Sequence, residues 1–305
     1  MSITTCNVHN ENSHLKSVIV GIADSWGDIP TPEEAIDPKS REHILAGTYP
    51  IEENVKRELD GLVKVLENEG IIVYRPQNVD GLNQVFTRDV GVVITDKLVR
   101  TSMIDDRAPE WNGISPLFSR INSSDILTPP KGVRVEGGDV MPMDDEIWVG
   151  IGDAKDFDVF KTARTNEAAV VWLKEKFPNH TLRAFALSKS DTDPRLNALH
   201  LDCCLSPLGL GHAIFHPEGM KNEADREWIR EYYAGKIIEV DSESMYHMHC
   251  NLFSISPATI ISGEGFNRVN AQLREWGYRV IEIPMNETSK MEGLLRCVTL
   301  PILRS

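Results

Sequence analysis

The sequence lacks a long apolar run. No stretch of about 18 or more apolar residues interrupts its 305 residues, so we expect no membrane-spanning segment. The N-terminal segment, Met1 to His14, is polar and includes Glu11, which is not typical of a secretory signal peptide. These absences predict a cytoplasmic protein that does not enter a membrane.

Positive charge is scarce. The chain has 32 Lys and Arg residues against 46 Asp and Glu residues, which gives a formal net charge of −14. Nucleic-acid binding needs clustered Lys and Arg side chains, so this balance argues against a nucleic-acid partner. It permits a cationic substrate, which an acidic surface attracts, but an acidic surface that only maintains solubility is an equally good interpretation.

Cysteine is also sparse and irregularly spaced. The five cysteines are Cys6, Cys203, Cys204, Cys250 and Cys297. An odd number without regular spacing predicts free thiols in a reducing compartment and not a disulfide framework. A buried, unreactive side chain is the ordinary role of such a cysteine.

What the sequence does contain is a recurring α/β pattern. Paired strands, a helix and one more strand follow each other roughly every 45 to 70 residues, which predicts repeated units. The predicted helices cover residues 51–66, 166–177, 221–233 and 266–276. The predicted strands cover residues 16–22, 71–74, 90–95, 98–103, 146–151, 182–187, 212–216, 236–240, 252–256, 259–262, 278–283 and 296–303.

The first and last predicted elements can belong to one unit. The final strand can share a unit with the first strand and helix, which gives about five units in a closed α/β ring without edge strands. No Pro-, Gly- or Ser-rich linker divides the chain, so we expect one domain over residues 1–305. Residues 105–131 show weak periodicity and predict a lid or a crossing loop.

Four short segments carry reactive side chains, and each lies at the edge of a predicted strand. They are FTRD ending in Asp89, EGGD from Glu136 to Asp139, HLD from His200 to Asp202, and LRC ending in Cys297. If HLD is extended, its histidine and aspartate point to the same face. Each segment alone has an ordinary structural interpretation as a turn, a polar pair or a packed thiol. Their joint occurrence and order favour a common site.

This ordered set, with RCVTLP near the C-terminus, resembles the guanidino-group-modifying enzymes, or penteins. The family includes arginine deiminases, dimethylarginine dimethylaminohydrolases and amidinotransferases, and the resemblance runs from Val18 to Arg304. It implies a five-fold pseudosymmetric α/β propeller, built from ββαβ units, with the active site at its centre.

The resemblance also implies roles for individual residues. Cys297 corresponds to the nucleophile, His200 to the general acid and base, and Glu136 to the carboxylate that orients the histidine or contacts the substrate. Asp89 and Asp202 correspond to the acids that hold the guanidinium, and Asp139 is a further candidate for substrate binding. Arg296 either binds a substrate carboxylate or pairs with a structural acid. The segment RTN, which begins at Arg164, is expected to support the site.

Physical chemistry is consistent with these roles. A guanidinium is planar and cationic, so carboxylates bind and orient it, while its carbon is a poor electrophile. A thiolate whose pKa is lowered by a nearby cation is a suitable nucleophile. A histidine held in one tautomer by a carboxylate can protonate the leaving amine and then activate a second nucleophile. This chemistry requires no metal and no organic cofactor.

The sequence departs from its relatives just before the nucleophile. Relatives carry two or three glycines there, whereas residues 290–295 read KMEGLL and keep only Gly293. The substrate is therefore expected to differ from that of well-known members.

Two activities fit the same residues. One is a hydrolase that uses water to act on arginine or a substituted arginine, and the other is an amidinotransferase that uses an acceptor amine. EGGD, RTN and the chain length favour the hydrolase. The partner of either is a small cationic guanidino compound, and a homo-oligomer is compatible with the sequence.

Two further interpretations are less favoured. A non-catalytic pentein would be expected to lack the cysteine and the histidine, which are both present. A zinc site could draw on histidines and cysteines at 200, 203, 204, 247, 249 and 250, but their spacing matches no standard pattern, so we expect no metal.

Overall fold

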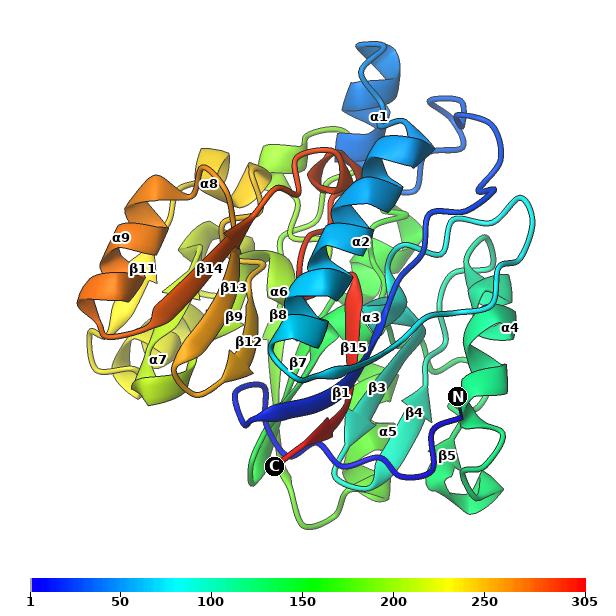
Figure 1. Ribbon diagram of the computed structural model, residues 1–305. Coiled ribbons are helices and arrows are strands. Elements are labelled where there is room, and N and C mark those ends of the chain that lie inside the picture. The colour runs from blue at the N-terminus through cyan, green and yellow to red at the C-terminus, as the bar shows by residue number, and fades with distance from the viewer. Residues whose placement is uncertain (1) are drawn as a thin grey trace.

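Five small sheets form the frame of the protein. The computed structural model describes residues 2–305, and each sheet in this range has three strands. In every sheet two antiparallel neighbours are followed by a third strand that runs parallel to the middle one. The repeated ββαβ unit expected from the sequence is confirmed, and Figure 1 shows the strands of the units side by side.

The sheets follow each other along the chain. The strands are β1 (Leu15–Val20), β2 (Ile72–Tyr74), β3 (Gly91–Ile94), β4 (Lys97–Arg100), β5 (Ile126–Leu127), β6 (Val140–Met143), β7 (Glu146–Ile151), β8 (Thr181–Ala186), β9 (Leu205–Pro207), β10 (Ala213–Phe215), β11 (Ile237–Glu239), β12 (Phe253–Ser256), β13 (Thr259–Gly263), β14 (Arg279–Ile283) and β15 (Thr299–Arg304). The helices are α1 (Pro38–Leu45), α2 (Glu52–Asn68), α3 (Thr87–Val90), α4 (Trp111–Ile114), α5 (Glu167–Lys176), α6 (Leu201–Cys204), α7 (Glu223–Tyr232), α8 (Ser242–Tyr246) and α9 (Asn267–Glu275).

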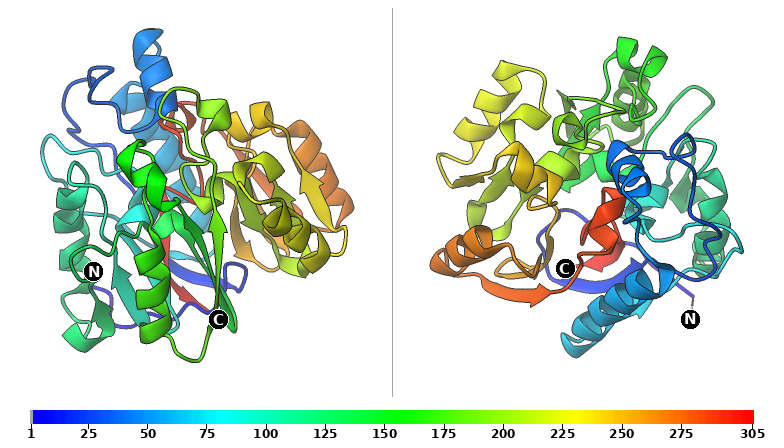
Figure 2. Two further views of the ribbon diagram at one scale, coloured as in Figure 1. Left: turned by 180° about the vertical axis from the view of Figure 1, so that it is seen from behind. Right: turned by 90° about the horizontal axis from the view of Figure 1, so that it is seen from above.

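Long helices cover the outside of the ring. Helix α2 buries Val55, Leu59, Leu62 and Leu66, which recur at helical spacing and form one apolar stripe. Helices α5, α7 and α9 occupy the same place in three other units, and Figure 2 shows them at the periphery. Strands β3 and β10 are buried at every position instead of alternating, which is typical of strands covered on both faces.

The unit of β3, β4 and β5 is the exception. Its crossover holds only the short helix α4 and several 3₁₀ turns, in the region expected from the sequence to be a lid or crossing loop. Trp111 and Phe118 of this crossover stack with ring centroids 6.2 Å apart. The segment is therefore packed on the molecule through its aromatic side chains.

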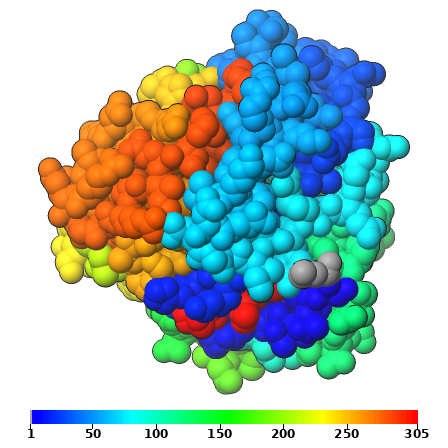
Figure 3. Space-filling model, in the orientation of Figure 1, coloured from blue at the N-terminus to red at the C-terminus, as the bar shows by residue number. Residues whose placement is uncertain are grey.

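The ring is closed by the two ends of the described chain. Strand β15 pairs antiparallel with β1, with Val20 opposite Thr299, and β2 completes that sheet. The expected sharing of one unit by the first and last strands is confirmed. The expected absence of edge strands is wrong, because the five sheets are separate and each described sheet of three strands has two edges. On the face seen in Figure 3, α2 lies beside the segment of α9 and β14.

A short turn precedes the first strand of each unit and points to the centre. Three of these turns are α3, the 3₁₀ turn Gly137–Asp139 and α6, and two are turns at residues 247–250 and 295–298. The predicted strand at residues 296–303 was wrong at its start, since β15 begins at Thr299. The HLD segment is not extended either, because its residues enter α6. None of the helices in residues 2–305 is both long enough and apolar enough to cross a bilayer.

Candidate active site

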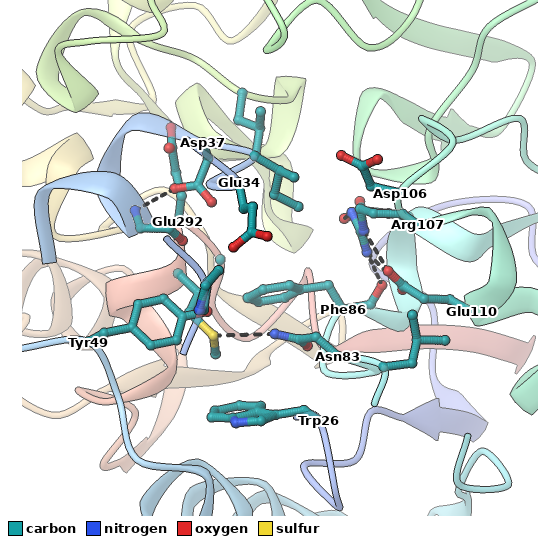
Figure 4. A pocket seen from close by; sticks show the side chains of 18 of the residues that line it. Trp26, Glu34, Asp37, Tyr49, Asn83, Phe86, Asp106, Arg107, Glu110 and Glu292 are labelled. Carbon is teal, nitrogen blue, oxygen red and sulfur yellow. Dashed lines mark hydrogen bonds and ion pairs between the residues drawn. The ribbon is translucent and has the colours of Figure 1, made fainter. Parts of the chain in front are cut away.

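A cavity of about 800 Å³ opens at the centre of the ring. The turns before β3, β9 and β15 contribute Asp89, His200 and Cys297 to its lining. The remaining walls come mainly from residues around α1 and from the crossover that contains Arg107 and Glu110 (Figure 4). Three of the residues proposed from the sequence therefore face one space.

His200 lies between two carboxylates. Its Nε2 is 2.8 Å from Oε2 of Glu136, and its Nδ1 is 3.6 Å from Oδ1 of Asp89. All three side chains are almost completely buried. The orientation of the imidazole is thus fixed from both sides.

The charges around His200 favour its protonated form. Burial alone would lower its pKa, but Asp89, Asp139 and the hydrogen bond with Glu136 outweigh burial and raise the pKa to about 9. For Glu136, burial alone would raise the pKa, but Arg164 and His200 lower it well below its usual range. These shifts favour an imidazolium paired with a carboxylate.

Cys297 is buried at the floor of the cavity. Its Sγ is 3.6 Å from Oδ2 of Asp202 and 3.2 Å from Nδ2 of Asn251. Burial, Asp202 and Asp89 raise the pKa of the thiol well above its usual range. This environment favours the protonated thiol.

Asn251 is a site residue that the sequence interpretation missed. Its Oδ1 accepts hydrogen bonds from the backbone N–H groups of Arg296 at 2.9 Å and Cys297 at 3.3 Å. Its Nδ2 donates to Sγ of Cys297 and to the backbone carbonyl of Asp202. Asn251 precedes β12 as Asp89 precedes β3, so the five-fold repeat was the signal that could have identified it.

Arg296 lies beneath the cavity and not in it. Its guanidinium donates to Asp202 at 2.7 Å and to Glu11 at 2.9 Å, and it also donates to the backbone carbonyls of Gly138 and Val140. Of the two roles expected for Arg296, the structure shows pairing with buried acids. Glu11 had been noted only as a polar residue of the N-terminal segment.

Asp202 and Asp139 are also set back from the cavity. Asp202 is joined to both Arg296 and Cys297, so it contacts the thiol from behind. Asp139 accepts a hydrogen bond from the backbone N–H of Leu201 at 3.0 Å. Neither side chain is among the described residues that line the cavity.

Two further arginines bind the site carboxylates. Arg107 donates to Asp89 at 2.7 Å and to both oxygens of Glu110 at 2.7 and 3.0 Å. Arg164, which begins the RTN segment, donates to Glu136 at 3.0 and 3.2 Å, in agreement with its expected supporting place. The sequence interpretation missed Arg107 because it lies in the weakly periodic region before α4.

Two glycines allow close approach around these groups. A β-carbon on Gly138 would lie 2.7 Å from the ring of His200, and one on Gly293 would lie 2.3 Å from the ring of Phe86. The second glycine of EGGD is therefore required for the histidine to pack against the backbone. Gly293, the glycine that remains before Cys297, is required for a comparable reason, because it packs against Phe86.

The arrangement suits a proton better than a metal ion. Asp89, Glu136 and His200 place one donor atom each within 4.8 Å of one another, and they are the one such cluster in residues 2–305. Both ring nitrogens of His200 already face carboxylates, and its pKa is raised, whereas a metal needs a neutral imidazole. The histidines and cysteines weighed for zinc do not converge in the described residues.

Known proteins resemble this chain in sequence and in structure. The uncharacterized protein YkgA of Bacillus subtilis is 32% identical over 245 residues, which are 80% of this chain and 78% of YkgA. The inosamine-phosphate amidinotransferase of Streptomyces griseus has a similar structure, with a TM-score of 0.77, 18% identity and coverage of 98% and 97% of the two chains. The N-terminal domain of the cyanobacterial arginine dihydrolase ArgZ, covalently bound to a reaction intermediate, matches with a TM-score of 0.75, 19% identity and coverage of 94% and 98%.

A family model described as eukaryotic N,N dimethylarginine dimethylhydrolase matches residues 47–304, which include every one of the five turns at the centre. The chain therefore belongs to this family and is a guanidino-group-modifying enzyme of the pentein superfamily.

Proposed function

We propose that the protein hydrolyses the guanidino group of arginine or a substituted arginine through a covalent adduct on Cys297. The observation that carries this proposal is the grouping of a buried thiol, a charged histidine and carboxylates around one cavity. The localisation in the cytoplasm and the single-domain organisation remain predictions of the sequence.

The acids explain how a guanidinium is held. Asp89 lines the cavity beside His200 and can orient a planar cation by charge-assisted hydrogen bonds, while Asp202, which lies behind Cys297, adds negative charge to the same end of the cavity. The same carboxylates raise the pKa of the thiol in the free enzyme. A bound cation offsets their negative field, which lowers the thiol pKa and lets its proton leave to solvent. Binding thereby generates the nucleophile.

Cys297 then forms the first covalent bond. The thiolate Sγ attacks the guanidino carbon and gives a tetrahedral adduct. His200 donates its proton to the departing nitrogen as the C–N bond breaks, which leaves a thiouronium group on Cys297 and a neutral imidazole. Glu136 holds the ring throughout by its 2.8 Å contact.

Water completes the reaction in this proposal. Neutral His200 accepts a proton from a water molecule whose oxygen attacks the thiouronium carbon, and cleavage of the C–S bond returns the thiolate. The family match and the dihydrolase relative support water as the second nucleophile. An amidinotransferase would differ only in that an acceptor amine takes the place of water.

Intact-protein mass spectrometry combined with product analysis tests the mechanism. The protein is incubated with a panel of guanidino compounds, with and without acceptor amines. We expect release of ammonia, an amine or urea and a transient adduct on Cys297, while transfer of the amidino group to the amine would identify a transferase instead.

A pair of cysteine variants provides the control. Cys297→Ala should abolish turnover and adduct formation and keep the thermal unfolding midpoint near that of the parent protein. Cys6→Ala removes a buried thiol that does not line the cavity and should remain active. Full turnover by Cys297→Ala would refute the proposed nucleophile.

A further inference from the structure

The cavity is strongly acidic beyond the reacting groups. Its lining includes eight carboxylate-bearing residues but only three Lys or Arg residues among those described. The acids are Asp28, Glu33, Glu34, Asp37, Asp89, Asp106, Glu110 and Glu292. Catalysis of guanidine cleavage requires only the few that contact the reacting end.

Each basic residue of the lining already has a carboxylate partner. Arg107 is bound by Glu110 and Asp89, and Arg164 is bound by Glu136. Lys161 pairs with Asp106 at 3.0 Å. Every lining arginine and lysine in residues 2–305 therefore already has a carboxylate partner.

Two buried acids lie on one wall of the cavity. Asp37 is 6% exposed and Glu292 is 5% exposed, and neither takes part in an ion pair within the described residues. Figure 4 shows them next to each other, across the cavity from Arg107 and Glu110. Burial of two neighbouring carboxyl groups is costly unless a cation lies between or beside them.

Hydrogen bonds hold the two acids in place. The backbone N–H of Ser40 donates to Asp37 at 2.6 Å, and Nδ2 of Asn197 donates to Glu292 at 2.6 Å. The ammonium of Lys39 donates to the backbone carbonyl of Tyr246 and lies 4.4 Å from that tyrosine ring. Its charge lowers the pKa of Glu292, but burial and Asp37 outweigh this effect.

Glu292 has an unusual backbone conformation. Its φ is 58°, in the left-handed region that glycine adopts without strain and other residues adopt at a cost of about 1 kcal/mol. This is the segment in which the sequence departs from the glycines of its relatives. A glutamate at this position has a strained backbone, and its carboxyl group lines the same cavity as Cys297.

We propose that the enzyme prefers guanidino compounds whose other end carries a second positive charge, and that Asp37 and Glu292 bind this second cation. This inference rests on the proposed function, because it requires the guanidino end to occupy the space between Cys297 and His200. Burial and Asp37 raise the pKa of Glu292 well above its usual range, and a cation between the two acids would favour their ionised forms.

A series of four compounds that differ in the charge of the tail tests the inference. Agmatine has a cationic tail, butylguanidine a neutral tail, 4-guanidinobutyrate an anionic tail, and L-arginine carries both charges. We expect kcat/KM to be greatest for agmatine and to fall by roughly tenfold or more for butylguanidine, which lacks one charge-assisted contact. The anionic compound should be the poorest substrate.

Variants of the two acids identify the subsite. Glu292→Gln and Asp37→Asn should each bring the ratio of kcat/KM for agmatine over butylguanidine closer to one. Glu175→Gln removes the same charge from an exposed position on α5 outside the cavity and should keep the parent ratio. Thermal unfolding of all three establishes that they are folded, and Asp37→Asn retains an acceptor for Ser40.

The possible results separate the two proposals. A preference for arginine or 4-guanidinobutyrate over agmatine, or an unchanged ratio in both acid variants, would overturn the second-cation inference alone. Absence of turnover and of any adduct on Cys297 with all four compounds would overturn the proposed function as well.

Discussion

The buried histidine should make the stability of the protein depend on pH in the alkaline range. His200 is 1% exposed, and Asp89, Asp139 and Glu136 outweigh the effect of burial and raise its pKa from 6.5 to about 9. Because the pKa is higher in the folded than in the unfolded state, folding stabilises the protonated form. This contribution is fully present below about pH 6.5 and is lost as the pH rises through about 9.

The difference between the two pKa values corresponds to about 3 kcal/mol of unfolding free energy. Urea unfolding at pH 6 and pH 10 measures it, provided that the parent protein is compared with His200→Gln. Lys39 and the other titrating groups are present in both proteins, so the difference between their pH responses isolates His200. The parent should lose about 3 kcal/mol more than the variant between these pH values.

An exposed histidine supplies the control. His14→Gln should respond to pH as the parent does, because His14 lies at the surface. If the parent and His200→Gln lose the same unfolding free energy between pH 6 and pH 10, the charged state assigned to His200 is refuted. The proton that His200 donates in the proposed mechanism would then have to come from another group.

Two further substitutions test the frame of the site. Asn251→Ala removes the amide that contacts Sγ of Cys297 and two backbone N–H groups, so kcat should fall roughly tenfold to a hundredfold; an unchanged kcat and an unchanged rate of Cys297 alkylation would contradict this role. Gly138→Ala puts a β-carbon 2.7 Å from the ring of His200, so chemical denaturation should show a loss of about 1–3 kcal/mol. Gly61→Ala, in α2 with no atom within 4 Å of the new carbon, should instead be neutral or stabilising.

Most of the architecture follows from local sequence patterns. The apolar stripe of α2 and the apolar runs of β7 and β13 follow simple periodicities, and their repetition along the chain was sufficient to predict the ring of units. Closure by the first and last strands could also be inferred, because the final strand otherwise has no unit. What the patterns could not give were the short strands, such as β5 with two residues and β9 with three.

The site was predictable in part. Asp89, His200 and Cys297 do face one cavity, as their order in the chain suggested. The error at residues 296–303 has a local reason, since Leu295 to Val298 form a turn although all four residues are buried and three of them are apolar. A helical turn places reactive side chains at the centre more compactly than an extended segment, and hydrophobicity alone does not distinguish the two.

Partners that are distant in sequence were the part that could not be predicted. Arg296 had two possible roles, and its ion pairs with Asp202 and with Glu11, 285 positions away, decide between them. The repeat places Asn251 at the centre, but its contacts with Cys297 are seen only in the structure. Such contacts depend on how separate units meet, which a single sequence does not encode in any local pattern.

The pairing of β1 with β15 has a consequence for folding kinetics. Strand β15 begins two residues after Cys297, and its partner β1 lies near the other end of the described chain. Closing so long a loop is entropically costly and slows folding, whereas the units in between pair strands that are much closer in sequence. We therefore expect the pocket around Cys297 to form late. An incompletely folded chain then carries this cysteine before the residues that select its substrate surround it.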